Sequence, residues 1–407
     1  MEATATTPAA LAAAARTAAP SDARPDARPD THPGAPTGEE PPAGAASAAA
    51  GPTAAIGAGA GVGAGADVPA LACRGLWKLF GPDPHGYLTR LNGRVPDTAS
   101  LEADGYVSAV RDVSLDIPRG EMLVVMGLSG SGKSTLLRCM ARLVEVTGGD
   151  VMVEGQAIGA LDEAGLIDLR RRKMGMVFQN FALLPHRTVL ENVAFPLEMR
   201  GQDRATRRAR ALEVIRLVGL EGREAHFPRE LSGGQQQRVG IARSLAIEPD
   251  IWFLDEPFSA LDPLIRREMQ DEFIRLRALL GKTIVFVTHD FDEALRLADR
   301  IAIMRDGVVE QCDTPDRIVV APATDYVARF TEDVEKARVV HAAAIAELLT
   351  GPVPEGAAVP GSATIRELAR QLAGDTRAAV PVAGADGAII GTLDRARALD
   401  MLFGAAR

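Results

Sequence analysis

The segment MLVVMGLSGSGKSTLLRCM, residues 122–140, constrains the fold of this chain more than any other part of the sequence. An apolar run of strand type leads into a glycine-rich loop, and the loop leads into a helical pattern. Three apolar side chains are expected on one face of that helix: Leu136, Met140 and Leu143. Glycine-rich loops turn backbone N–H groups inward, and a helix N-terminus adds positive potential. The segment therefore predicts a binding site for the phosphates of a nucleoside triphosphate.

The loop has the form Gly-x4-Gly-Lys-Ser, and each residue type has a chemical reason. We expect Lys133 to reach the β- and γ-phosphates and Ser134 to offer its hydroxyl to Mg²⁺. A glycine-rich turn without a ligand is the alternative, and the flanking strand and helix argue against it. The remaining residues of this predicted phosphate loop are Gly127, Ser129, Gly130, Ser131, Gly132 and Thr135.

Two adjacent carboxylates end a second apolar run, IWFL at residues 251–254. Asp255 is predicted to join the Mg²⁺ shell, directly or through water. Glu256 is predicted to polarise the attacking water as a general base. A pair of solvated acids at a strand end is the alternative. The apolar strand favours the first interpretation, because it directs both acids to the sheet edge where phosphate loops lie.

Single polar residues end two more apolar runs, Gln179 after MGMVF and His289 after TIVFVT. Either residue could have a purely structural role. Both, however, are expected at the same sheet edge as the phosphate loop. We therefore predict that Gln179 contacts Mg²⁺ and the attacking water, and that His289 donates to the γ-phosphate.

The fold class follows from four short, wholly apolar runs at 122–126, 174–178, 251–254 and 283–287. Runs of this kind separated by helical patterns predict an α/β fold, with a parallel sheet covered by helices on both faces. The alternation in VSAVRDVSLDI, residues 107–117, predicts a half-buried antiparallel strand. RIAIMRDGVVEQ predicts a hairpin that turns at Asp306-Gly307.

Composition changes divide the chain into three parts. Residues 1–68 are rich in Ala, Pro, Gly and Thr and are predicted to be a disordered tail. Residues 70–335 carry the motifs, with a Pro- and Gly-punctuated insertion at 82–107. Residues 341–407 form a small α/β-like unit with the expected order helix, AAVPV strand, turn at Gly387, AIIGTL strand and helix.

The overall composition limits the possible partners and compartment. With 47% apolar and 24% charged residues the chain is typical of soluble globular proteins, and we identify no membrane span or secretory signal in it. The net charge of −9 argues against a nucleic-acid partner. Three scattered cysteines fit a reducing compartment without a disulfide framework.

LSGGQ, residues 231–235, precedes a helix and could bind a second phosphate group, although it has no lysine. A second phosphate site is redundant within one chain that already has a complete loop. It makes sense if the segment closes over the γ-phosphate held by another copy of the chain, in a head-to-tail dimer. A simple helix cap by Ser232 is the alternative. The residues concerned are Ser232, Gly233, Gly234 and Gln235.

These motifs in this order resemble those of the ATP-binding cassette (ABC) family. Walker A is GLSGSGKST, the Q-loop contains Gln179, the signature is LSGGQ, Walker B is IWFLDE, and His289 is the switch histidine. The D-loop is SALD, which ends at Asp262. The resemblance covers residues 70–335 and implies a RecA-like core, an antiparallel β subdomain, a helical signature subdomain, and ATP hydrolysis with Mg²⁺. It also implies that an aromatic residue, Phe80 or less strongly Tyr106, stacks on adenine.

A finer resemblance is to the ATP-binding subunits of quaternary-amine importers, carried by VFQNFALLPHRTVLENVAF and DEPFSALDPLIRREMQDE. It implies uptake of glycine betaine or proline betaine in osmoprotection, by a homodimer beneath integral-membrane permease subunits and with an extracytoplasmic substrate-binding protein. The subunit would lie at the cytoplasmic face of the inner membrane. The NFALLP segment would line the groove that receives the permease's coupling helices.

Three alternatives remain at this stage. The importer could carry another solute, such as an amino acid, choline or carnitine, because these subunits do not touch the cargo. A non-transport ABC ATPase is disfavoured, since the chain lacks a second cassette and a coiled-coil insertion. Lastly, residues 341–407 resemble a single cystathionine-β-synthase-type (CBS) module, and this unit could be a regulatory ligand-binding module or a degenerate one.

Overall fold

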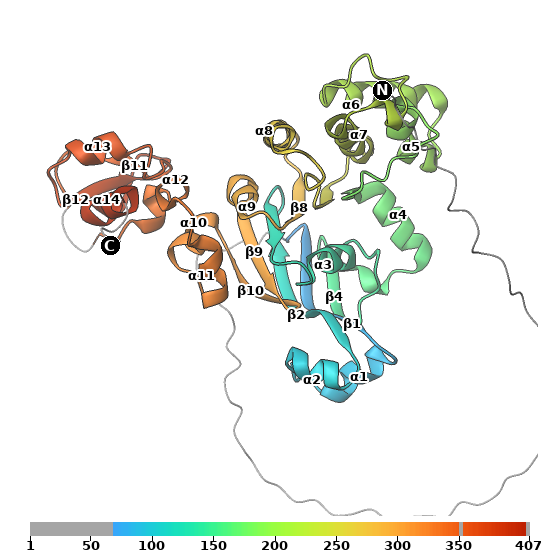
Figure 1. Ribbon diagram of the computed structural model, residues 1–407, viewed down its shortest axis with the longest axis horizontal. Helices are drawn as coiled ribbons and strands as arrows, with labels where there is room; N and C mark the ends of the chain where they lie inside the picture. The colour runs from blue at the N-terminus through green and yellow to red at the C-terminus, as the bar shows by residue number, and fades with distance from the viewer. Residues whose placement is uncertain (1–67, 350–352, 404–407) are drawn as a thin grey trace, which may run out of the picture. The chain divides into compact units, whose positions relative to one another are not determined.

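The computed structural model describes residues 68–349 and 353–403 (Figure 1). The predicted tail at 1–68 lies outside the described residues, apart from Val68. A six-stranded sheet has the order β10-β9-β3-β8-β7-β6. The pairs that join β6, β7, β8, β3 and β9 are parallel, and β10 pairs antiparallel with β9. Its strands are β3 (Met122–Met126), β6 (Met174–Val177), β7 (Ile251–Asp255), β8 (Thr283–Thr288), β9 (Arg300–Arg305) and β10 (Val308–Asp313).

The parallel sheet is buried on both faces, as its apolar sequence predicts. In β3, alternate side chains enter two separate hydrophobic clusters: Val124 joins one, and Leu123 and Val125 join the other. The helices that surround this sheet include α3 (Lys133–Met140), α7 (Gly233–Leu245), α8 (Pro263–Leu280) and α9 (Phe291–Leu297). The predicted α/β class is confirmed, and so is the hairpin at Asp306-Gly307.

One detail of the predicted helix after the phosphate loop is wrong. Leu143 does not lie on the buried face of α3, because the helix ends at Met140. The chain turns away at Arg142, whose φ of 53° is in the left-handed region. Leu143 is 47% exposed, whereas Leu136 and Met140 are fully buried as expected.

A second sheet is antiparallel, with the order β2-β1-β4-β5. The alternating segment at 107–117 is β2, and it pairs antiparallel with β1, as the sequence predicts. The strands are β1 (Leu71–Phe80), β2 (Val107–Ile117), β4 (Gly148–Val153) and β5 (Gln156–Ala157), followed by the short helix η1 (Ile158–Ala160).

The insertion at 82–107 contains two short helices, α1 (Pro84–Leu91) and α2 (Thr98–Ala103). Each begins at an aspartate whose side chain caps it: Asp83 accepts from the Gly86 amide, and Asp97 from the Ser100 amide. The insertion has its own small core, in which the Tyr87 and Tyr106 rings stack with centroids 4.1 Å apart. It is therefore an ordered element that extends the antiparallel sheet (Figure 1).

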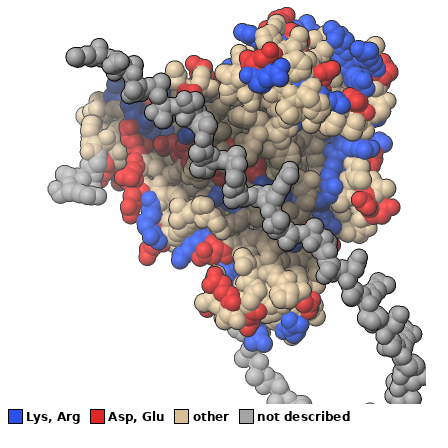
Figure 2. All heavy atoms as spheres, turned by 45° about the vertical axis from the view of Figure 1, so that its right-hand side comes forward, with Lys and Arg blue, Asp and Glu red and all other residues tan. Residues whose placement is uncertain are grey.

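Helices form a further region before the signature segment: α4 (Glu163–Lys173), α5 (Val189–Met199), α6 (Arg204–Leu217) and the short η2 (Pro228–Glu230). The arginine-bearing side of helix α6 is solvated. Arg204 and Arg208 are exposed, and Arg210 forms an ion pair with Glu248 at 3.0 Å. Acidic and basic side chains are interspersed over much of the face in Figure 2, with Lys and Arg gathered near its upper right.

The C-terminal part begins with helices that follow β10: α10 (Pro315–Val320), α11 (Asp325–Thr331), α12 (Lys336–Val339) and η3 (Ala342–Ile345). A three-stranded sheet follows in the order β11-β12-β13. Its elements are β11 (Val359–Pro360), α13 (Ala369–Gly374), β12 (Ala379–Ala383), β13 (Ile389–Asp394) and α14 (Arg395–Phe403). The predicted order helix, strand, turn at Gly387, strand, helix is confirmed. The resemblance to a CBS module stays a prediction.

Candidate active site

The phosphate loop joins β3 to α3, and two of its glycines, Gly127 and Gly132, have close backbone neighbours. A Cβ atom on Gly132 would lie 1.9 Å from the Ala109 carbonyl oxygen, and one on Gly127 would lie 2.2 Å from the Met304 carbonyl oxygen. Their φ angles of 100° and 149° are also unfavourable for residues with side chains. The loop can therefore take this path only with glycine at both positions.

Lys133 is held inside this loop. Its Nζ donates to the Leu128 carbonyl oxygen at 2.9 Å, and the residue is buried. Burial lowers the pKa of Lys133, while the negative charges of Glu256 and Asp255 act in the opposite direction. The Oγ of Ser131 is buried, with no hydrogen-bond partner among the described residues. A cation and an unsatisfied hydroxyl at the same loop fit a phosphate ligand.

Asp255 is the last residue of β7 and is 1% exposed. Its Oδ1 accepts from Ser134 Oγ at 2.7 Å, and its Oδ2 accepts from Arg138 Nη2 at 3.0 Å. A hydroxyl and a carboxylate side by side are oxygen ligands that suit Mg²⁺. Within 68–349 and 353–403 there is no group of three or more His, Cys, Asp or Glu residues that could hold a metal ion. The site therefore fits a Mg²⁺ ion that takes further ligands from phosphate oxygens and water.

Glu256 follows β7 directly, with a φ of 45° and a backbone N–H that donates to the Val287 carbonyl oxygen at 3.0 Å. Its Oε2 lies 3.1 Å from His289 Nδ1 and accepts from Gln179 Nε2 at 3.4 Å. Gln179 and His289, which follow β6 and β8, therefore both contact the carboxylate of Glu256 at the end of β7. Gln179 and His289 are both exposed, so they can reach a ligand outside the sheet edge.

The LSGGQ segment forms the N-terminus of α7 with a capping box. Ser232 Oγ accepts from the Gln235 amide at 3.3 Å, and Gln235 Oε1 accepts from the Ser232 amide at 3.0 Å. Ser232 and Gly233 are exposed, while Gly234 is buried. Asp262 similarly caps α8, where it accepts from the Ile265 amide at 3.1 Å. The helix-cap interpretation is thus correct for the single chain, and it leaves the helix terminus open to a ligand.

The two candidate adenine-stacking residues lie in different environments. Phe80 ends β1 and is 48% exposed, and Lys78 Nζ lies 4.8 Å from its ring centroid. Tyr106 is 6% exposed, because its ring stacks on Tyr87 inside the insertion. Of the two residues, Phe80 therefore has the more accessible ring.

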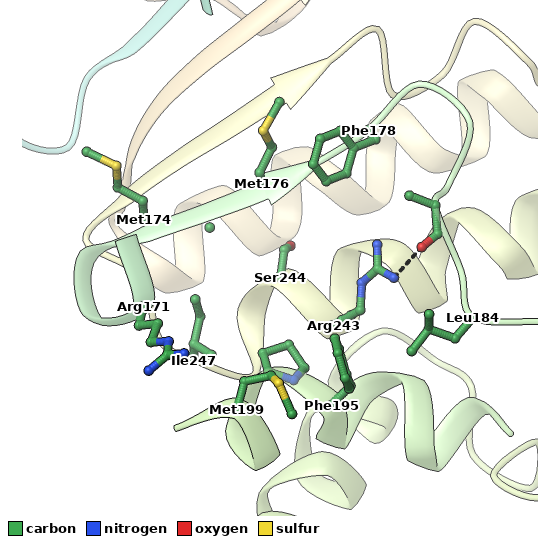
Figure 3. Close-up of a pocket in the computed structure, with 13 residues that line it drawn as sticks. Arg171, Met174, Met176, Phe178, Leu184, Phe195, Met199, Arg243, Ser244 and Ile247 are labelled. Carbon is green, nitrogen blue, oxygen red and sulfur yellow. Dashed lines mark hydrogen bonds between the residues drawn. The ribbon is translucent and has the colours of Figure 1, made fainter. Parts of the chain in front are cut away.

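A pocket of about 400 Å³ lies beside β6, between α5 and α7 (Figure 3). Of the NFALLP segment, Ala182 and Leu184 line this pocket, whereas Phe181 and Leu183 pack against the main core. The lining is largely apolar, with Met174, Met176, Phe178, Phe195 and Met199.

Arg243, from α7, also lines this pocket and was not singled out from the sequence. Its guanidinium donates to the carbonyl oxygens of Phe181 at 3.0 Å and Ala182 at 2.6 Å. Both of those residues have positive φ angles, so Arg243 fixes an unusual turn. Its burial lowers its pKa. The acceptors are backbone atoms, which leave no pattern in the sequence.

A phosphate loop between the central strand and a helix, with an acidic strand end opposite, defines a P-loop nucleoside triphosphatase. Residues 110–259 match the family described as ABC transporter. A trimethylamine N-oxide transport system ATP-binding protein of Ruegeria pomeroyi is 70% identical over 339 residues, which cover 83% of this chain and 98% of the relative. The chain belongs to the ABC transporter family, as one of its ATP-binding subunits, and this membership implies ATP binding and hydrolysis.

Other relatives and solved structures agree with this family membership. A glycine betaine/proline betaine transport system ATP-binding protein of Escherichia coli is 50% identical over 276 residues, covering 68% of this chain and 69% of the relative. The dimeric structure of MJ0796, a bacterial ABC transporter cassette, is 36% identical and has a TM-score of 0.51. It covers 60% of this chain and 98% of that one. The predicted resemblance to quaternary-amine importer subunits is confirmed.

Proposed function

We propose that this chain is the ATP-hydrolysing subunit of an importer for small amines with a fully substituted, positively charged nitrogen. Trimethylamine N-oxide, glycine betaine and proline betaine are such solutes. The observation that carries the proposal is the match to trimethylamine N-oxide transport proteins at 70% and 59% identity. The relatives named for glycine betaine are 47–50% identical.

Trimethylamine N-oxide is the first candidate cargo. The 70% match extends over 98% of that relative. The match to the Escherichia coli glycine betaine protein covers 69% of that relative. Glycine betaine is the second candidate, supported by the number of relatives with that name. A sulfate/thiosulfate importer subunit from Xanthomonas campestris reaches 46% identity over 56% of this chain, so the cassette alone does not specify the cargo.

The arrangement of the site supports a division of roles for hydrolysis. Lys133 and the loop amides would hold the β- and γ-phosphates, with Ser134, Asp255 and Gln179 around Mg²⁺. When bound, Mg²⁺ neutralises charge on the phosphate oxygens. Glu256 would accept the proton of the attacking water. His289, 3.1 Å from Glu256, would hold that carboxylate in place and donate to the γ-phosphate.

A second copy of the chain would complete the site. The amides at the N-terminus of α7 are exposed at Ser232 and Gly233 and would close over the partner's γ-phosphate. Gly234 and Gln235 would complete this surface, and Asp262 would couple the two sites. The related MJ0796 cassette was solved as a dimer, which supports a head-to-tail homodimer here.

The subunit would work at the cytoplasmic face of the membrane, with integral-membrane permease subunits and an extracytoplasmic substrate-binding protein. None of the helices in the described ranges is long and apolar enough to cross a bilayer. The apolar pocket beside β6, which Arg171 and Arg243 also line, would suit an amphipathic helix of the permease (Figure 3).

Uptake of labelled solutes tests this proposal. Cells that lack the chain would be complemented with the wild type or with Glu256→Gln and assayed at high osmolarity with trimethylamine N-oxide, glycine betaine and a neutral amino acid. We expect only the wild type to restore uptake of the first two solutes. Normal uptake of both in the uncomplemented cells would refute the proposed cargo class.

A further inference from the structure

We propose that Arg111 is a positioning residue for nucleotide binding. It couples the insertion at 82–107 to the phosphate loop. The inference rests on the proposed nucleotide site. Arg111 lies in β2 and is 7% exposed. Arg111 does not belong to the family motifs, and its guanidinium donates to the backbone oxygens of Asp306 and Pro96.

The guanidinium of Arg111 joins two distant parts of the chain through their backbones. Its Nη1 donates to the Pro96 carbonyl oxygen at 2.8 Å, between α1 and α2 of the insertion. Its Nε donates to the Asp306 carbonyl oxygen at 2.9 Å, in the turn between β9 and β10. The backbone N–H of Arg111 also donates to the Gly307 carbonyl oxygen at 2.8 Å. One residue therefore holds both the insertion and the turn.

The turn held by Arg111 touches the phosphate loop. Asp306 and Gly307 have φ angles of 49° and 81°, as a tight two-residue hairpin requires. The Gly307 N–H donates to the Ser131 carbonyl oxygen at 3.1 Å. A Cβ atom on Gly307 would lie 3.2 Å from the Ala109 carbonyl oxygen, so the turn is also pressed against β2.

The hydrogen bond to Ser131 sets the direction of a phosphate-binding amide. The Ser131 carbonyl and the Gly132 N–H belong to one planar trans peptide unit, so they point in opposite directions. When the turn holds the Ser131 oxygen, the Gly132 N–H is aimed away from the turn. If the turn shifts, this peptide unit can rotate, and the loop loses one aligned donor for the phosphates.

Arg111 suits this role because it is buried and bidentate. Its planar fork can bind Pro96 and Asp306 at once, whereas a lysine would hold one of them firmly at most. Removing it would leave two carbonyl groups without their donors and would loosen the turn relative to the insertion. We expect the consequence to be weaker nucleotide binding rather than a slower chemical step, because Glu256 and His289 belong to other strand ends.

The experiment uses the full-length chain with Arg111→Ala and Arg111→Lys, and measures ATP affinity by calorimetry, kcat, KM and melting temperature. Arg74→Ala is the matched control, because Arg74 lies in the neighbouring strand β1 and makes an exposed ion pair with Asp116. For Arg111→Ala we expect the Kd and KM for ATP to rise about three- to thirtyfold, with a smaller change in kcat. Arg111→Lys should recover part of this loss. Arg74→Ala should bind ATP like the wild type.

A lower melting temperature for Arg111→Ala with an ATP affinity equal to that of Arg74→Ala would overturn the proposal, because Arg111 would then only stabilise the fold. If Arg111→Ala does not fold, Arg111→Lys decides in the same way, since wild-type affinity in that folded variant would also overturn it. Lys133→Ala separates this failure from failure of the proposed function. Unchanged ATP binding in Lys133→Ala would show that the nucleotide site itself is misassigned.

Discussion

His289 Nδ1 lies 3.1 Å from Glu256 Oε2, so the ends of two neighbouring parallel strands, β8 and β7, meet through a histidine and a carboxylate. Glu256 is 17% exposed at its side chain, and His289 is 55% exposed. The carboxylate is thus partly sheltered while its partner faces outward. In the proposed mechanism, His289 would contact the γ-phosphate and at the same time orient the carboxylate of Glu256.

Replacement of Glu256 by Gln tests the base assignment. The amide cannot accept a proton, so ATP hydrolysis should fall by about 10²–10⁴-fold. ATP binding should persist, because Lys133 and the loop are unaltered, and size-exclusion chromatography with ATP and Mg²⁺ should then show a trapped dimer. Glu332→Gln, at an exposed position, is the control. A purely monomeric Glu256→Gln variant would rule out the composite site.

The two aromatic candidates near the adenine position should respond differently to truncation. Phe80→Ala should weaken ATP binding by about 1–3 kcal/mol, the usual value of base stacking, with little change in stability. Tyr106→Ala should instead lower the free energy of unfolding by about 3–5 kcal/mol, because its buried ring supports the insertion. Calorimetry and urea denaturation of both variants check this. Equal effects on binding would contradict the assignment to Phe80.

Glu293, in α9, should make stability depend on pH. It is 5% exposed and accepts from Gln270 Nε2 at 2.8 Å. Burial raises its pKa above the ordinary value of 4.5, although hydrogen bonds from Thr288 and Gln270 act against this. The folded state therefore holds the proton more tightly than the unfolded state. The associated stability is present below pH 4.5 and is lost as the pH rises through the folded-state pKa.

The variant Glu293→Gln keeps the shape of the protonated acid and cannot ionise. In urea denaturation, its stability relative to the wild type should therefore increase as the pH rises from 4.5 through the folded-state pKa of Glu293. Asp292→Asn, an exposed change on the same helix, is the control and should show no such trend. If the stability difference between Glu293→Gln and the wild type stays constant as the pH rises, burial does not raise the pKa of the Glu293 carboxyl.

All three thiols should be unreactive in the folded protein. The cysteines are free, and burial raises the pKa of Cys73 to about 12 and those of Cys139 and Cys312 to about 11. Because the thiolate is the reactive form, alkylation by N-ethylmaleimide at about pH 8 should be slow until denaturant is added. Mass spectrometry of timed samples measures this. Rapid labelling of any one cysteine in the native protein would contradict it.

The sequence predicts the sheet and the strand-end residues well, because these depend on local patterns. Apolar runs identify β3, β6, β7 and β8, and parallel strands place their carboxyl ends at one edge. The sequence does not reveal Arg111 or Arg243, since each binds backbone carbonyls far away in the chain. The helices α1 and α2 were missed for another reason. Their Asp caps are present, but the short segments bury few side chains, so the apolar periodicity is weak.

The different surroundings of the loop glycines limit which substitutions these positions can accept during evolution. Any residue other than glycine at position 132 would displace the backbone of β2, whose Ala109 oxygen would lie 1.9 Å from the new Cβ. At Gly130, by contrast, a Cβ atom would meet nothing within 4 Å, and only the φ of 83° restricts the choice. Asn and Asp tolerate that conformation best. Among natural homologues, position 130 should therefore carry occasional replacements, whereas position 132 should always be glycine.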